Sequence, residues 1–123
     1  MSVRSVALPS TNNGDLSQAT VTIGPFDVRS IPAAAVQIGW SGSPVGTLQL
    51  QGTTGQPTQS SNQANTWPGP WAVIGSPVSL PLSTGGTSQA WDLAQTGMSA
   101  VQVVYTRTSG TGTVTLATGQ QKT

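Results

Sequence analysis

The side chains that most often carry out catalysis are scarce in this sequence of 123 residues. Histidine, cysteine and glutamate are absent, so the commonest general base and the usual zinc ligands are missing. A serine nucleophile would have no base beside it, and paired carboxylates for glycoside hydrolysis would have to come from three aspartates far apart in the chain. A calcium site begun by one aspartate lacks ligand spacing. We therefore expect no enzyme, no metal site and no cofactor. The aspartates are Asp15, Asp27 and Asp92.

Tryptophan rings are the next candidates, because they can bind rather than catalyse. Trp67 and Trp71 border a Pro/Gly turn after a long polar stretch, where they could stack on a sugar or fill a pocket on a partner. The other interpretation places them in the core. The two interpretations stay equally open for Trp67, and the core is favoured for Trp71. Trp40 and Trp91 lie in strand-like runs, and we expect them in the core.

Arg107 is the third candidate for a binding residue. It lies at the end of a strand-like run, where a lone arginine usually forms a surface pair, and Asp92 is the natural partner. The sharper alternative is a contact between subunits, because arginine is enriched at interfaces.

Charge is unusually low, and this excludes several classes of partner. Charged residues make up 6% of the chain, against about 25% in typical domains, and the net charge is +1. Four scattered basic residues cannot form the patch that tracks phosphates, so we expect no nucleic-acid partner. No apolar run is long enough for a membrane span, and the N-terminal residues lack a secretion signal, so we expect synthesis in the host cytoplasm. A near-neutral surface suits packing against copies of itself or against a lattice. The basic residues are Arg4, Arg29, Arg107 and Lys122.

Apolar and polar residues alternate with a period of two along most of the chain. This period is typical of strands with one buried and one solvated face. The clearest runs cover residues 36–40, 47–51, 101–106 and 113–116. Weaker candidates cover residues 3–8, 19–23, 26–31, 71–74, 78–82 and 90–93, and residues 92–95 could form one helical turn. The alternation predicts that six side chains point inward: Val36, Ile38, Leu48, Leu50, Val103 and Val114.

Clusters of Gly, Pro, Ser and Asn separate these runs and predict turns. Residues 109–112 (Ser-Gly-Thr-Gly) lie between two alternating runs, and we interpret them as a hairpin joining the last two strands. Residues 52–70 form one long polar loop, the kind that is usually functional or mobile. Many short strands with such turns predict one all-β domain over residues 1–123, an antiparallel two-sheet β-sandwich, with a jelly roll among its forms. Strand order cannot be settled from periodicity.

The N-terminal residues 1–15 are a candidate arm. Val3, Val6 and Leu8 form a small apolar set, followed by Pro9 and a polar turn. A strand this short does not hold itself in place, so it could add to the sheet edge of a neighbouring subunit or of a capsid. The alternative, equally open, is that it forms the first strand of its own sandwich.

Parts of residues 36–116 resemble a known class of proteins. The residues that carry the likeness are 46–52 (Gly-Thr-Leu-Gln-Leu-Gln-Gly), 71–74 (Trp-Ala-Val-Ile), 90–93 (Ala-Trp-Asp-Leu), Gly97 and the run 101–114, with Tyr-Thr-Arg-Thr-Ser-Gly-Thr-Gly as its most specific string. The pattern is similar to β-sandwich structural proteins of tailed-bacteriophage virions, among which capsid decoration (cement) proteins are prominent.

The resemblance implies a role in the virion, which the low charge and the lack of catalytic residues suit. We expect a decoration protein on the outer surface of the head that binds the lattice of the major capsid protein, stabilises it, and forms a homotrimer. The alternative is a carbohydrate- or receptor-binding module of a tail, collar or fibre. The partner-binding candidates are Val3, Val6, Leu8, Trp67, Trp71 and Arg107.

Overall fold

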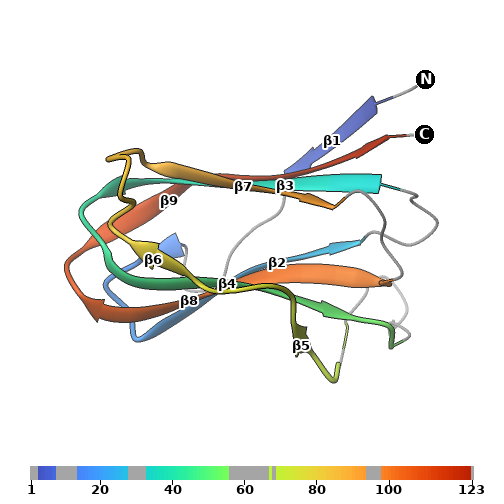
Figure 1. Ribbon diagram of the computed structural model, residues 1–123, viewed down its shortest axis with the longest axis horizontal. Coiled ribbons are helices and arrows are strands. Elements are labelled where there is room, and N and C mark those ends of the chain that lie inside the picture. Colours follow the sequence, from blue (N-terminus) through green and yellow to red (C-terminus); the bar gives the residue numbers. More distant parts are fainter. Residues whose placement is uncertain are drawn as a thin grey trace, which may run out of the picture.

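The protein is described by a computed structural model that covers residues 3–7, 14–27, 33–55, 67, 69–93 and 98–122. Over these residues the chain forms two antiparallel β-sheets that pack face to face, with no α-helix (Figure 1). No helix among them is long and apolar enough to cross a membrane. The predicted all-β sandwich is confirmed.

Each sheet combines strands from both halves of the chain. The first sheet has the order β1-β9-β3-β7, and the second has the order β2-β8-β4-β5, with β6 also paired to β4. The strands are β1 (Val3–Ala7), β2 (Thr20–Asp27), β3 (Ala33–Gly42), β4 (Val45–Thr53), β5 (Ala72–Val73), β6 (Val78–Leu80), β7 (Ser88–Leu93), β8 (Ala100–Ser109) and β9 (Gly112–Lys122).

The weaker predicted strands agree with these bounds in most places. The predicted runs at 19–23 and 26–31 meet in one strand, β2, whose pairing with β8 shifts register between Ile23 and Phe26; residues 28–31 lie outside the described part of the chain. Asp92 lies in β7 rather than in a helical turn, and residues 94–97 lie outside the described part of the chain.

The two sheets are joined by a ribbon that folds over at one end of the sandwich. In the first sheet β3 pairs with β9 from Ala33 to Gly42, and in the second β4 pairs with β8 from Val45 to Thr53. The pairing therefore continues around the corner with only small register shifts. The pairs β1–β9 and β2–β8 flank this ribbon on one side, and β7–β3 and β6–β4 flank it on the other.

The predicted hairpin at residues 109–112 is wrong in its pairing. β8 and β9 follow each other directly but belong to different sheets, so the turn crosses between the sheets. Residues 43–44 make the neighbouring crossing from β3 to β4, and the Ser43 N–H donates to the Thr111 carbonyl oxygen at 2.8 Å. Gly42 and Gly110 both have positive φ angles, which let the two crossings lie close together.

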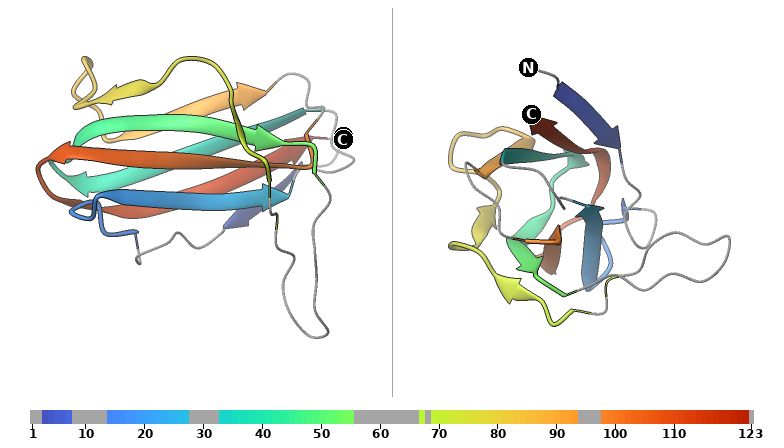
Figure 2. Two further views of the ribbon diagram at one scale, coloured as in Figure 1. Left: turned by 90° about the horizontal axis from the view of Figure 1, so that it is seen from below. Right: turned by 90° about the vertical axis from the view of Figure 1, so that its right-hand side faces the viewer.

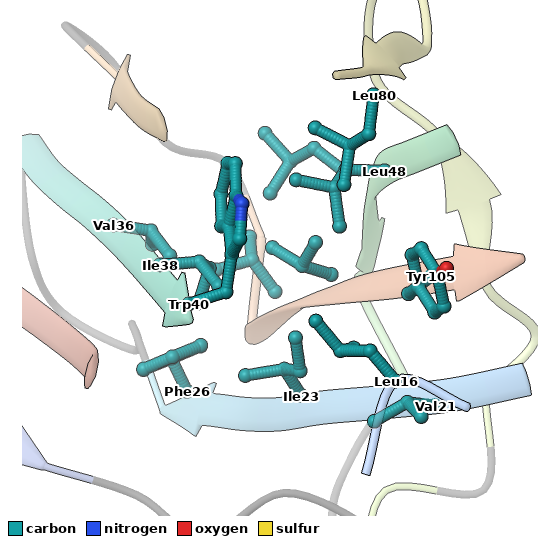
Figure 3. Close-up of a cluster of buried hydrophobic side chains, with 13 residues drawn as sticks. Leu16, Val21, Ile23, Phe26, Val36, Ile38, Trp40, Leu48, Leu80 and Tyr105 are labelled. Atoms are coloured by element: carbon teal, nitrogen blue, oxygen red, sulfur yellow. The ribbon is translucent and has the colours of Figure 1, made fainter. Parts of the chain in front are cut away.

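The core lies between the two sheets, and the alternation predicted part of it. Five of the six side chains expected inward are at most 2% exposed, and Val114 is half-buried and packs against them. Figure 3 shows side chains from both sheets pointing toward one another. The buried cluster consists of Leu16, Val21, Ile23, Phe26, Val36, Ile38, Trp40, Leu48, Leu50, Leu80, Val101, Val103 and Tyr105.

Tyr105 is the largest of the fully buried side chains. Its hydroxyl donates to the Val45 carbonyl oxygen at 3.3 Å. Burial raises the pKa of Tyr105 above its ordinary value near 10, because the tyrosinate would lose its hydration. Nearby Arg107 lowers that pKa by a smaller amount.

We expect this tyrosine to make stability fall at alkaline pH. The folded state holds the proton more tightly than the unfolded state, so stability is constant below about pH 10 and falls as the pH rises toward the folded pKa. Urea unfolding between about pH 8 and pH 11 measures this slope. The Tyr105→Phe variant, which removes the only tyrosine, should lose about 1 kcal/mol at neutral pH and show a flatter slope above pH 10. An equal slope in both proteins would contradict the assignment.

Candidate binding surface

The outer face of the second sheet carries a neutral array of polar side chains. On β2, β8 and β4 the apolar residues point inward, so the residues between them point outward. We call this surface the Thr/Gln face; it comprises Thr20, Thr22, Thr47, Gln49, Gln51, Gln102, Val104 and Thr106. None of the eight is charged.

The strand register arranges these residues in rows across the sheet. Thr106 lies opposite both Thr20 and Thr47, and Val104 lies opposite Thr22 and Gln49. The third row joins β8, β4 and β5, where Gln51 lies opposite both Gln102 and Val73.

Two glutamine contacts organise the β5 end of the face. Gln49 donates from Nε2 to the carbonyl oxygens of Leu50 at 2.9 Å and Ile74 at 3.2 Å, which holds the segment after β5 against β4. Gln102 donates from Nε2 to Gln51 Oε1 at 2.8 Å. Although Gln102 lies on the outer face, it is only 9% exposed. Within the described part of the chain, Gln51 Nε2 and Gln102 Oε1 make no further hydrogen bond, so a donor and an acceptor stay open.

The short strand β5 borders this glutamine pair. Figure 1 places β5 below the plane of β4 and β8, and the view from below in Figure 2 shows the chain around it crossing the outer side of that sheet. Val73 is 66% exposed and shares the face with Gln51. Trp71 is half-buried and lies directly before β5, two residues before Val73. A Cβ on Gly69 would lie 3.0 Å from Trp71 Cδ1, which shows that the ring packs against that turn.

The predicted tryptophans therefore separate into two kinds. Trp67 is buried at 9% exposure, so it presents no ring face for stacking. Trp71, for which the sequence favours the core, is instead half-buried and does not belong to the core cluster. Trp40 lies in the core as expected, and Trp91 is half-buried and packs against the core from β7.

Arg107 does not pair with Asp92, because the two lie on strands of different sheets. Arg107 is exposed, and its Nε–H donates to the Gly110 carbonyl oxygen at 2.9 Å across the corner turn. The carboxyl group whose pKa Arg107 affects is that of Asp15. The pKa of Asp15 is lowered mainly by hydrogen bonds from the Ser17 hydroxyl and amide, and Arg107 adds a smaller effect in the same direction.

In the single chain, β1 pairs with β9 of its own sheet, in the register Val3 to Lys122 and Ala7 to Thr118. This matches the alternative in which residues 3–7 form the first strand of their own sandwich. Val3 and Val6 lie on β1, where the structure describes only the backbone, and Leu8 lies outside the described residues.

The sequence located most of the Thr/Gln face but not its glutamine pair. Alternation placed Gln51 and Gln102 on the polar side of their strands, yet their contact depends on the register of strands about 50 residues apart, which no local pattern reports. Across the described residues, no group of three acidic, histidine or cysteine side chains is placed to hold a metal ion.

No protein-family model matches this chain, and no curated protein is similar to it in sequence.

Proposed function

We propose that this chain is a non-enzymatic structural protein of a bacteriophage virion, which binds the outside of the capsid and stabilises the head. The likeness of residues 36–116 to virion proteins motivates the proposal. The chemistry of the chain suits it, because few groups capable of catalysis are present and the surface carries little charge.

The observation that carries the proposal is the strand order. With β6 as the edge partner of β4, the two sheets read β1-β9-β3-β7 and β2-β8-β4-β6, and each pair of facing strands is consecutive along the chain. This order supports a jelly roll, a fold that recurs in viral capsid and lectin domains. Fold likeness alone does not assign a function, so the chemistry of the surface must fit it as well.

A neutral hydrogen-bonding face suits a protein that covers a lattice in many copies. Like charges do not build up between copies, and a homotrimer bound at several points needs no strong single contact. A ligand that binds only the assembled shell stabilises that shell by mass action.

The test is binding to heads of the phage that encodes the chain, stripped of the protein. We expect saturable co-sedimentation, a higher temperature of head disruption, and a trimer in light scattering. Binding should weaken by less than about threefold between 50 and 200 mM salt, because few charges take part; electrostatic binding with 6–10 phosphate-like contacts would fall by roughly a thousandfold or more.

Two results would contradict the proposal. One is the absence of binding to stripped heads in any salt. The other is localisation of the protein in intact virions to the tail alone, measured by cryo-electron microscopy.

A further inference from the structure

We propose that the β5 end of the Thr/Gln face binds a neutral carbohydrate, with Trp71 as the stacking ring and the Gln51–Gln102 pair as the hydrogen-bonding group. This inference concerns the isolated domain and does not depend on attachment to a capsid.

The glutamine pair offers an unusual combination of atoms. Gln102 Nε2 donates a hydrogen bond to Gln51 Oε1 at 2.8 Å. The Nε2 donors of Gln51 and the Oε1 acceptor of Gln102 remain open, side by side on adjacent strands. Gln102 as a whole is nine-tenths buried, whereas its unpaired Oε1 keeps contact with solvent, where a ligand can reach it. Two neighbouring hydroxyls of a sugar match this pattern, because one hydroxyl can accept from Gln51 while the other donates to Gln102.

The apolar part of the site lies next to this pair. Val73, directly opposite Gln51, is 66% exposed, and Trp71, two residues earlier in the chain, is half-buried. Ligand sites in proteins combine apolar and aromatic surface with a few placed polar groups, and a sugar offers apolar C–H faces and hydroxyl edges to match. The row from β8 through β4 to β5 spans two strand spacings, about 10 Å, which is close to the length of a disaccharide.

Charge selects the class of sugar. None of the residues on the Thr/Gln face is positively charged, so none can form an ion pair with a carboxylate or a phosphate. Arg107, next to Thr106 at the far end of the face, uses its Nε–H on Gly110. Uronic acids, sialic acids and phosphorylated glycans would lose hydration without gaining an ion pair, so the site should favour uncharged hexoses.

The experiment uses the indole N–H signals of the four tryptophans in a nitrogen–proton correlation spectrum of the whole chain. Maltohexaose, cellohexaose and mannohexaose are the neutral probes, and oligogalacturonate is the charged control. At millimolar concentrations we expect at least one neutral probe to shift the Trp71 signal, assigned with Trp71→Phe, while the signal of Trp40 in the core stays in place.

Three variants locate the contact. Binding is measured here by isothermal titration calorimetry, because Trp71→Ala removes the reporting signal. Trp71→Ala and Gln102→Leu should each weaken binding by at least about tenfold, whereas Ser79→Ala, on β6 opposite Thr47 at the other end of β4, should leave it unchanged. Gln51→Leu should behave like Gln102→Leu and serves if that variant folds poorly.

Other results overturn the proposal. If none of the three neutral probes moves the Trp71 signal, or if the charged oligomer moves it equally, the site is not one for neutral sugars. If the Trp71 signal instead changes with protein concentration in the absence of sugar, the surface is a contact between copies of the chain.

Discussion

Replacing Gly110 with alanine is expected to destabilise the protein by about 2–5 kcal/mol, the sum of a backbone and a packing cost. Gly110 has φ +75°, a conformation that costs an alanine about 1–2 kcal/mol. Its Cβ would also overlap the Ser43 carbonyl oxygen and lie 3.2 Å from the Val45 amide nitrogen. Those atoms belong to the backbone of the neighbouring crossing, so relief requires the corner between the sheets to move. Urea unfolding of the purified variant measures the loss.

Gly85→Ala is the matched control for the corner. Gly85 has φ +78°, but a Cβ there would meet nothing within 4 Å. Gly85→Ala should therefore lose only the stability that the unfavourable φ angle costs, about 1 kcal/mol, and part of this loss is offset because alanine stiffens the unfolded chain. If Gly110→Ala and Gly85→Ala lost the same free energy of unfolding, the close contact between the two crossings would not contribute to the stability of the corner.

Leu48→Ala is expected to cost about 2–5 kcal/mol, because it removes a fully buried side chain from the contact between the sheets. Leu48 lies on β4 beside Tyr105 of the paired strand, and both point into the core. A cavity there cannot close easily, since strands β4 and β8 are fixed by their own hydrogen bonds. The free energy of unfolding should fall with little change in the dependence on urea.

Leu116→Ala tests whether burial is the cause. Leu116 is 40% exposed and lies over Gly39 on the outer face of the first sheet. The same chemical change should cost no more than about 1 kcal/mol there. Comparable losses at Leu48 and Leu116 would show that the core has been placed on the wrong face of the strands.

The parts of the fold that follow from local chemistry could be predicted from sequence. The alternation around Ile38, Leu50 and Val103 fixes which side chains point inward, because successive residues of a strand face opposite sides. Pairing depends on distant residues, and there the predictions were less successful. A Gly-rich turn at 109–112 is compatible with a hairpin or with a crossing between sheets, and only the strands that flank it decide.

The candidate site shows the same division. Trp71 was singled out because of its neighbouring Pro and Gly, which is a local signal. Trp67 has the same neighbours and is buried, since burial depends on what packs over the ring. The Asp92 partner proposed for Arg107 failed for a similar reason, because the two residues are near in sequence but lie on different sheets.

The continuous ribbon has a consequence for how the protein is made. β8 and β9 occupy interior positions of their sheets, between β2 and β4 and between β1 and β3, yet they are translated after every strand that they pair with. Among the described strands, β1 and β2 have no neighbour to pair with until β8 and β9 emerge from the ribosome, and β3 and β4 have only the short β7, β5 and β6. Such long-range closure is slow compared with hairpin formation, typically milliseconds to seconds for all-β domains. Completion of the two sheets therefore waits until β8 and β9 have emerged, and a ribosome stalled before residue 100 would hold a chain with exposed strand edges.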